Sequence, residues 1–380
     1  MYGEALAKPP TILLVGDYMW PWYQEACARA LEILGCRVIR FGWFSDFWRW
    51  IPERAEPVYC SVYQRAQYRY QFGPTVWRIN RRLLRIATQF KPDLVWFYNV
   101  TLISPAIVKK LRALLPDAIF CQYCNDNPFS PLARPELWRH FIKSIPYFDI
   151  HFTYRHSNIA DYYRLGAHNV ELLRSYFVPH EDYPAPEQEI PDQFKCDVVF
   201  AGHYEDDGRV EYLNAICRAG FNLNLFGSGW QDALKRFELE PFLRSKYPIS
   251  PVFGADYRYA ICGAKVALCF FSTLNCDTYT RRNFQIPAMR VAMLSEYTDD
   301  MASLFRPDFE ACYFRTPEEM LEQLSRLLRN ADFRNEIAVA GYNRVYADNH
   351  SVVGRMETWL NQIAKIRKRF VSKDLLCSPG

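Results

Sequence analysis

Residues 11–41, TILLVGDYMWPWYQEACARALEILGCRVIRF, contain the pattern that decides the fold of the amino-terminal half. Thr11–Val15 is a short apolar run typical of a buried strand, and a helical pattern then extends to Leu34. Gly35 ends that helix, and a second strand follows at residues 37–41. This order predicts two parallel strands joined by a right-handed crossover, and therefore a doubly wound α/β domain.

The same alternation continues along the first half of the chain. Helices are predicted at residues 75–90 and 104–115, and strands at 93–98, 118–123, 150–153 and 170–173. The aromatic segment FGWFSDFWRW, residues 41–50, interrupts the pattern. It either covers the core or lines a cleft.

A second α/β pattern begins near residue 196. Strands are predicted at residues 196–201, 222–226, 265–271 and 291–294, and helices at 318–328, 331–348 and 351–368. The stretch before it is rich in proline and acidic residues, as interdomain linkers are. The sequence therefore predicts a first domain at residues 1–178, a linker at 179–193 and a second domain at 194–350. Two Rossmann-like domains of this kind are expected to face a cleft that binds ligands.

Length and charge constrain the function less sharply. The chain has 380 residues, half of them apolar, which suits two cores. The 46 basic and 42 acidic residues leave a net charge of +4, too balanced to indicate nucleic-acid binding. Basic residues do cluster locally, either as solvated helix faces or as contacts to a membrane surface or an anionic acceptor. These residues are Arg78, Arg81, Arg82 and Arg85, and then Lys365, Arg367, Lys368 and Arg369.

The cysteines indicate a reducing compartment. The twelve cysteines are scattered through apolar segments, as small core residues would be. Cys121 and Cys124 form one CxxC without a second pair or a histidine cluster, so neither a metal site nor a redox site is predicted. No signal-peptide pattern is present, and no apolar run approaches the ~20 residues that span a bilayer. We therefore expect a cytoplasmic protein.

The strongest candidate for ligand binding is NCDTYTRRNFQIPAM, residues 275–289. Arg281 and Arg282 are predicted near Gln285 at the start of a short helix, where a helix terminus and the planar guanidinium both favour a diphosphate. Asp277 precedes the helix, and its carboxylate and the Gln285 amide are groups that hold sugar hydroxyls. The alternative is a buried Arg–Asp pair that pins a loop.

Two glycine turns follow strands of the second domain. Gly202-His203 and Gly227-Ser228-Gly229 either let phosphate or ribose approach the backbone or simply end their strands. Arg209 lies just beyond the first turn and is either a further donor to the diphosphate or a surface arginine. Tyr257 either packs on the nucleotide base or belongs to the core.

Candidate catalytic residues lie in the first domain. Asp126, in Asn125-Asp126-Asn127-Pro128, either activates and orients an acceptor hydroxyl or caps the turn before the proline. Asp17 follows Gly16, where a glycine lets an acceptor approach, or is a helix cap. His156 and His203 are predicted near the cleft, and each has a purely structural alternative.

Several of these segments together resemble one glycosyltransferase family. Residues 93–350 resemble the CgeB-like, or spore-maturation-protein-like, branch of the GT-B glycosyltransferases, which is allied to the retaining family-four enzymes. The matching motifs are Asn125–Pro128 in the first domain and, in the second, DVVFAG at 197–202, FGSGW at 226–230, RNFQIPA at 282–288 and LSE at 294–296.

The resemblance implies a GT-B fold and a transferase. A nucleotide-diphosphate sugar, with UDP or GDP, would be held by the second domain, and a glycan, lipid or protein acceptor by the first. Transfer would retain configuration and need no obligatory metal, and a carboxyl-terminal helix at residues 351–370 would pack back on the first domain. Asp277 and Gln285 occupy the positions of the family's paired glutamates, and Arg290 replaces a small residue or glycine.

The implied role is polysaccharide, glycolipid or glycoprotein synthesis in the cytoplasm or at the inner face of the membrane, with peripheral membrane contact left open. Two other classes compete with it. One is a sugar-nucleotide epimerase or hydrolase on the same fold, and the other is a donor-binding scaffold without turnover.

Overall fold

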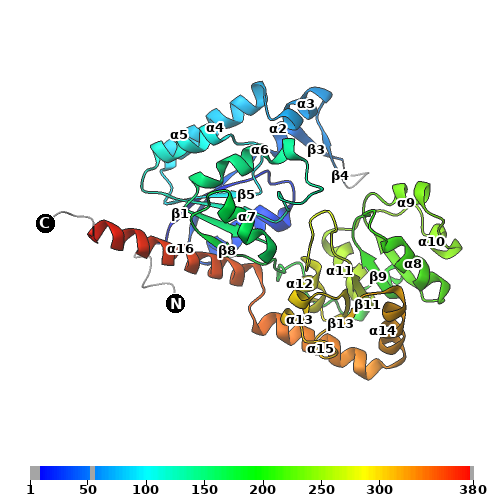
Figure 1. The fold of residues 1–380 in the computed structure, drawn as a ribbon. Helices are drawn as coiled ribbons and strands as arrows, with labels where there is room; N and C mark the ends of the chain where they lie inside the picture. Colours follow the sequence, from blue (N-terminus) through cyan, green and yellow to red (C-terminus); the bar gives the residue numbers. More distant parts are fainter. Residues whose placement is uncertain (1–8, 52–55, 377–380) are drawn as a thin grey trace. The chain divides into compact units, whose positions relative to one another are not determined.

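The computed structural model describes residues 9–51 and 56–376. The chain divides into two compact units (Figure 1). Unit 1 holds the chain up to Arg174 together with the segment from Val352 onward, and unit 2 holds Ser175–Ser351.

Unit 1 is built on a parallel sheet of six strands in the order β2-β1-β5-β6-β7-β8. The apolar runs predicted from the sequence form these strands, and four of them are buried throughout except for Thr11 at the start of β1. The strands are β1 (Thr11–Val15), β2 (Arg37–Phe41), β5 (Leu94–Tyr98), β6 (Ile119–Cys124), β7 (Ile150–Thr153) and β8 (Val170–Leu172).

Helices of unit 1 cover the sheet with their apolar faces. The helix predicted up to Leu34 begins with a π-helical turn at Pro21–Glu25 and continues as α1 (Ala26–Ile33). The other helices are α4 (Pro74–Phe90), α5 (Pro105–Leu114), α6 (Pro135–Ser144) and α7 (Ile159–Arg164). In α4, the residues at helical spacing Val76, Ile79, Leu83 and Ala87 are buried. The doubly wound α/β fold is thus confirmed for this unit.

The aromatic segment at residues 41–50 covers the core. It forms the short helix α2 (Phe44–Phe47) and the strand β3 (Trp48–Ile51), which pairs antiparallel with β4 (Glu56–Tyr59). Trp43, Phe47 and Trp48 are buried in the main cluster of unit 1. The helix α3 (Val62–Tyr70) follows and was not predicted from the sequence.

Unit 2 is built on a parallel sheet of five strands in the order β10-β9-β11-β12-β13. The strands are β9 (Cys196–Ala201), β10 (Leu223–Phe226), β11 (Ala264–Cys269), β12 (Ala292–Glu296) and β13 (Cys312–Phe314). The helices are α8 (Arg209–Arg218), α9 (Gln231–Arg236), α10 (Pro241–Ser245), α11 (Gly254–Cys262), α12 (Arg282–Ala288), α13 (Asp299–Leu304), α14 (Pro317–Arg329) and α15 (Ala331–Ala347). The β9-α8-β10 order places the glycine turns after β9 and β10 at one edge of the sheet.

Residues 179–193, which the sequence predicts as a linker, belong to unit 2. Ile190 packs with Phe194 and Ala260 in a small apolar cluster, and the side chain of Asp182 is only 3% exposed. Asp182 and Ile190 therefore anchor an otherwise mostly exposed segment to unit 2. Composition alone does not distinguish this from a solvated linker.

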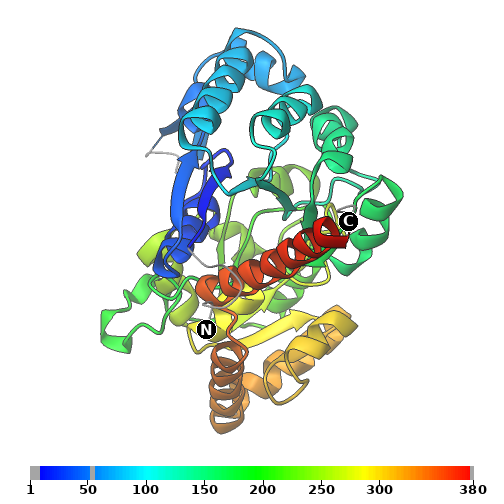
Figure 2. The ribbon, with the colours of Figure 1, turned by 90° about the vertical axis from the view of Figure 1, so that its left-hand side faces the viewer.

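The final helix, α16 (Val352–Leu376), joins unit 1 (Figure 2). It packs against α1, and Trp359 stacks on Trp96 of β5 with ring centroids 4.6 Å apart. The side chains of Lys368 and Arg369, part of the predicted basic cluster, lie outside the described residues. Within residues 9–51 and 56–376, no helix combines the length and hydropathy needed to cross a bilayer.

Candidate functional site

The first part of the site is the loop after β9, which carries Gly202 and His203 and ends at Arg209 of α8. The Arg209 side chain is almost fully buried. Its guanidinium donates from Nε to Asp207 Oδ1 at 2.7 Å and from Nη1 to the His203 carbonyl oxygen at 2.7 Å. Nη2 bonds the second Asp207 oxygen and the carbonyl oxygen of Phe271, at 3.3 Å in the latter case. The structure thus gives Arg209 partners other than a ligand, and we assign it to holding this loop against β11.

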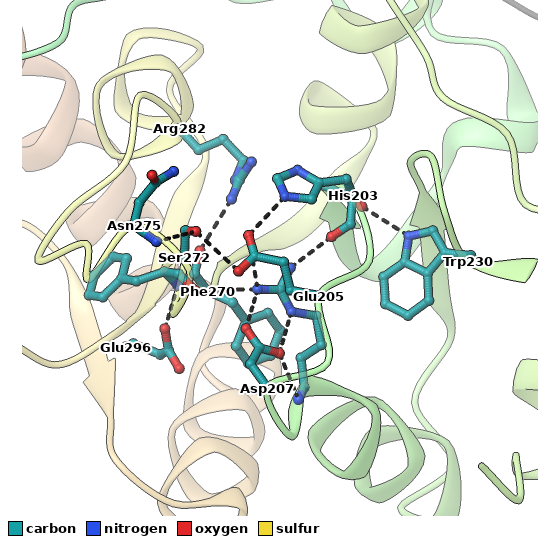
Figure 3. A network of polar contacts seen from close by, with 12 residues as sticks. His203, Glu205, Asp207, Trp230, Phe270, Ser272, Asn275, Arg282 and Glu296 are labelled. Atoms are coloured by element: carbon teal, nitrogen blue, oxygen red, sulfur yellow. Dashed lines mark hydrogen bonds and ion pairs between the residues drawn. The ribbon is translucent and has the colours of Figure 1, made fainter. Parts of the chain in front are cut away.

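Glu205 connects this loop to the segment after β11 (Figure 3). The His203 Nε2 atom lies 2.8 Å from Glu205 Oε1, and Ser272 Oγ donates to Glu205 Oε2 at 3.1 Å. Burial raises the pKa of Glu205, but the hydrogen bond from His203 and the charge of Arg209 outweigh burial and leave the pKa below its usual value. Glu205 is therefore an anion at neutral pH.

The two glycine turns interlock with each other. Gly202 N donates to the Phe226 carbonyl oxygen at 2.8 Å, and Trp230 Nε1 donates to the Gly202 carbonyl oxygen at 2.9 Å. Gly227 has φ of +150°, and a Cβ there would lie 1.9 Å from the Gly202 carbonyl oxygen. Ser228 accepts from Tyr204 N through its carbonyl oxygen at 2.9 Å, and Gly229 has φ of +80°. Backbone contact between the turns thus requires glycine at position 227, and the left-handed backbone favours glycine at position 229.

Arg282, at the start of α12, lies across the Gly202 turn. Its Cζ would be 3.4 Å from a Cβ at Gly202, and its guanidinium lies 5.7 Å from the Phe200 ring centroid. Nη2 donates to the Phe270 carbonyl oxygen at 3.1 Å, whereas the buried Nε has no hydrogen-bond partner among the described residues. Arg282 is therefore held at the carboxyl ends of β9 and β11 with donor capacity left over.

Glu296, the last residue of β12, lies in the same network (Figure 3). Its Oε2 accepts from Phe271 N. Burial raises the pKa of this carboxyl to about 7, with a further contribution from the charge of Asp207. Glu296 is thus a titratable group close to neutrality at this edge of the sheet.

Gln285 has a carboxylate as its partner. Its Nε2 donates to Asp182 Oδ1 at 2.8 Å, and its Oε1 accepts from Tyr257 Oη at 3.2 Å. The guanidinium of Arg281 lies 3.4 Å from Asp182 Oδ2. Arg281 and Gln285 thus come together as predicted, through an aspartate that sequence reasoning missed. The alternative of a buried Arg–Asp pair pinning a segment therefore describes Arg281.

Asp277 lies in the loop between β11 and α12. Its backbone N–H donates to the Ser272 carbonyl oxygen at 2.9 Å, which places it in the segment that also carries Ser272. Arg290, after α12, has φ of +57°, a left-handed conformation that favours glycine. A small residue or glycine, which the resemblance implies at this position, would thus suit the local backbone.

In unit 1, two predicted aspartates lie at the carboxyl edge of the sheet. Asp17, after β1, accepts from Met19 N at 3.0 Å and from Gln24 Nε2 at 3.4 Å. Asp126, after β6, accepts from Asn99 Nδ2 at 3.0 Å. Burial raises the pKa of Asp17, and the charge of Asp126 adds to the increase. The two carboxyls follow strands that are separated by β5 alone, at the same edge of the sheet.

His156 is not joined to these aspartates by any contact among the described residues. It follows β7, is exposed, and has its Nε2 atom 3.2 Å from the Nη2 atom of Arg174. In residues 9–51 and 56–376 no group of three or more histidine, cysteine, aspartate or glutamate side chains is arranged to hold a metal ion.

Comparison with protein families covers the part of this network that begins at Arg209. Residues 209–361 match a family described as glycosyl transferase-like. This stretch is thus similar to glycosyl transferase-like domains. It runs from Arg209 through Arg282, Gln285 and Glu296 into α16. No curated protein matches the chain in sequence.

Solved structures show the same fold over nearly the whole chain. Anabaena HepE in complex with UDP-glucose matches with a TM-score of 0.65 and 11% identity, covering 94% of this chain and 100% of that one. Sucrose-phosphate synthase from Thermosynechococcus elongatus matches with 0.66 and 11%, covering 96% and 99%. The α,α-trehalose 6-phosphate synthase from Burkholderia multivorans matches with 0.62 and 13%, covering 98% and 99%.

The solved structures confirm the predicted GT-B fold, and the match over residues 209–361 is to glycosyl transferase-like proteins, the enzyme class that the sequence predicts. The CgeB-like subtype stays a prediction, as do the roles of the individual residues. Sequence reasoning gave no role to four acidic residues of the network, of which only Glu296 lies in a motif that it noted: Asp182, Glu205, Asp207 and Glu296. The acidic run Glu205-Asp206-Asp207 directly after the Gly202 turn is a signal that could have pointed to two of them.

Proposed function

We propose that this protein transfers a sugar from a nucleotide-diphosphate donor, with UDP or GDP, to a hydroxyl of a glycan, lipid or protein. Unit 2 binds the donor and unit 1 the acceptor. The reaction retains configuration and requires no metal. The HepE structure that shares this fold contains UDP-glucose, which supports a UDP-sugar first.

The observation that carries this proposal is the placement of Arg282. Glycosyl transfer breaks the bond between the anomeric carbon and the β-phosphate oxygen, and the leaving diphosphate must be stabilised. Arg282 lies beside the Gly202 turn with its Nε unpartnered within the described chain. An arginine held in this way presents a planar donor to phosphate oxygens without prior reorganisation.

Gln285 and Asp182 are proposed to position the nucleoside. Gln285 lacks the charge of the glutamate expected at its position, but its amide is bonded to the Asp182 carboxylate. Asp182 and Tyr257 fix the orientation of that amide, and thereby the hydrogen-bonding groups that a ribose would meet. Asp277 keeps its proposed role toward donor hydroxyls, as do His203 and the turn at Gly227–Gly229 toward the donor.

The acceptor hydroxyl is proposed to meet Asp126 and Asp17 in unit 1. As the acceptor oxygen forms its bond to the anomeric carbon, its proton passes to a carboxylate or to the departing phosphate. Asp126 accepts a hydrogen bond from Asn99, which orients it. Burial raises the pKa of Asp17, so this carboxyl is suited to holding a proton. His156 stays a weaker candidate because Arg174 is its observed neighbour.

A thermal-shift panel tests the donor site. UDP, GDP, dTDP, ADP and CMP are each added with magnesium or with EDTA to the wild type, to Arg282→Ala and to Arg315→Ala. Arg315 is an exposed arginine of unit 2 and serves as the matched control. A ligand at ~100 times its dissociation constant stabilises by about 2.7 kcal/mol, or several degrees for a unit of this size.

We expect one diphosphate to raise the melting temperature equally with magnesium and with EDTA. The shift should be lost in Arg282→Ala and kept in Arg315→Ala. A shift that survives in Arg282→Ala would remove the observation on which the proposal rests. A shift that requires magnesium would contradict the metal-independent reaction.

A further inference from the structure

The segment from Ser61 to Pro92, which forms α3 and α4, has an unusual charge pattern. It contains seven arginine or lysine residues and no aspartate or glutamate. The chain as a whole is nearly balanced, with 46 basic and 42 acidic residues. This segment therefore concentrates positive charge that the rest of the chain does not have.

Large apolar side chains of the same segment are exposed. Val62 is 85% exposed, Phe72 64% and Trp77 51%, and Tyr63 and Tyr70 are also exposed. Phe72 and Trp77 contact each other edge to face with ring centroids 5.2 Å apart, so the end of α3 and the start of α4 share one apolar surface. A cluster of this kind is costly in water and marks an interaction site.

The arginines lie on the same outward faces of the two helices. Arg69 follows Val62 by seven residues on α3, and Arg81 and Arg85 follow Trp77 by four and eight on α4, so each set lies along one helix face. The buried residues Val76, Ile79 and Leu83 occupy the opposite face of α4. Figures 1 and 2 show α3 and α4 next to each other in unit 1.

Only part of this charge is neutralised. Arg78 and Arg82 both pair with Asp46 of α2, at 3.1 and 3.0 Å. Arg65, Arg69, Arg81 and Arg85 make no ion pair with any side chain that the structure describes, which are those of residues 9–51 and 57–367. The surface formed by the exposed apolar residues and these four arginines, here called the α3–α4 surface, is therefore both apolar and cationic.

We propose that the α3–α4 surface docks on an anionic lipid bilayer. Tryptophan and tyrosine favour the interface between headgroups and acyl chains, and arginine places its charge at the headgroups while its methylenes stay in apolar surroundings. Each arginine near an anionic membrane strengthens binding by about fivefold. The four arginines together supply several-hundredfold, which the exposed Trp77, Phe72 and Val62 supplement by insertion. Docking is separate from sugar transfer and does not depend on the donor site.

Vesicle co-sedimentation with the full chain tests this inference. The probes are phosphatidylcholine vesicles with and without about a third phosphatidylglycerol, in about 100 mM and about 500 mM salt. The test variant is Arg81→Gln with Arg85→Gln. The matched control is Arg244→Gln with Arg329→Gln, two exposed arginines of unit 2 that remove the same charge. Far-ultraviolet circular dichroism confirms that each variant is folded.

We expect binding to the anionic vesicles only, weakened by high salt. The test variant should bind at least tenfold more weakly, and the control variant should bind like the wild type. Equal loss in both variants, or no binding of the wild type to anionic vesicles, would overturn the proposal. Preferential binding to heparin or single-stranded RNA without vesicle binding would also overturn it, because the surface would then serve a soluble polyanion.

Quenching of tryptophan fluorescence gives a second readout. Lipids with brominated acyl chains quench only tryptophans that enter the bilayer. The wild type should be quenched, and Trp77→Phe, which keeps an aromatic ring, should lose most of that quenching while still co-sedimenting. Quenching unchanged in Trp77→Phe would contradict insertion at this surface.

Discussion

Replacing Gln285 with glutamate is the most informative single change in this chain. The resemblance to GT-B enzymes presents Gln285→Glu as a restoration of the usual residue. The structure predicts the opposite outcome for stability. Gln285 Nε2 donates to Asp182 Oδ1 at 2.8 Å, and the Asp182 side chain is 3% exposed. The substitution removes this donor and sets a second carboxylate against the first.

The magnitude follows from three terms. A hydrogen bond to a charged acceptor is worth about 1.5–3 kcal/mol. Two like charges about 3 Å apart repel by roughly 5 kcal/mol at an effective dielectric constant of 20. The introduced carboxyl avoids most of this by staying protonated, which costs about 4 kcal/mol at pH 7 from an ordinary pKa near 4.3. Arg281, 3.4 Å from Asp182, offsets part of the repulsion. We expect a destabilisation of about 2–4 kcal/mol at neutral pH.

This loss of stability should depend on pH. The introduced carboxyl has a higher pKa in the folded protein than in the unfolded chain, so the folded state holds the extra proton. Stability therefore falls as pH rises above about 4.5, and the destabilisation should be below about 1 kcal/mol near pH 5. Below neutrality the protonated carboxyl donates to Asp182, as the amide does in the wild type.

Urea denaturation at about pH 5 and about pH 7.5 measures the effect. The double variant Asp182→Asn with Gln285→Glu exchanges the amide and the carboxylate and should recover most of the lost stability. Gln231→Glu, at an exposed position in unit 2, should be neutral or slightly stabilising and serves as the control. A Gln285→Glu protein as stable as the wild type at pH 7.5, or a loss independent of pH, would refute this reasoning.

Three further predictions concern stability. Glu296→Gln should stabilise the protein by about 1–2 kcal/mol at pH 8 and by little at pH 5, because the Glu296 pKa of about 7 makes the wild type lose stability as pH rises from about 4.5 through 7. Denaturation at both pH values measures the difference in stability, and an equal effect at the two pH values would contradict the prediction. Gly227→Ala should lower the free energy of unfolding by more than about 3 kcal/mol, since the new Cβ meets the Gly202 carbonyl oxygen at 1.9 Å. The control Gly220→Ala, at a position with φ of +80° and open space, should lower it by about 1 kcal/mol. Equal melting temperatures for the two variants would count against the contact between the glycine turns. Arg290→Gly should raise the urea midpoint by an amount equivalent to up to about 1 kcal/mol, because glycine adopts the left-handed conformation at φ of +57° without strain. A lower midpoint would show that the arginine side chain stabilises the protein by more than the backbone strain destabilises it.

Most of the fold was predictable from local sequence patterns. The strands at 11–15, 37–41, 150–153 and 196–201 coincide with β1, β2, β7 and β9, because continuous apolar runs bounded by glycine or polar residues identify buried parallel strands. The short strand β13 and the helices α10 and α11 were missed. They lie where apolar periodicity is brief, and tertiary packing decides their structure.

The candidate site was predictable only in part. The stretch around Arg282 and Gln285 stood out because charged and amide side chains follow a buried strand. Asp182 did not, because its partner Gln285 is 103 residues away and its own surroundings resemble a linker. The hydrogen bonds that the Arg209 guanidinium donates to Asp207 and to two carbonyl oxygens likewise form only in the folded loop, so the sequence alone does not show them. Residue types identified the segments that form the site, whereas the hydrogen-bond and ion-pair partners became visible only in the folded structure.

Isothermal titration calorimetry tests the central claim most directly. Once the thermal-shift panel names the base, the nucleoside diphosphate and the monophosphate of that base are titrated into the wild type and into Arg282→Gln. A charge-assisted bond worth about 1.5–3 kcal/mol corresponds to a preference of roughly 10- to 150-fold for the diphosphate. We predict that preference in the wild type and its reduction below about threefold in the variant. A preference that persists undiminished in Arg282→Gln would contradict the account, because the diphosphate would then be held elsewhere.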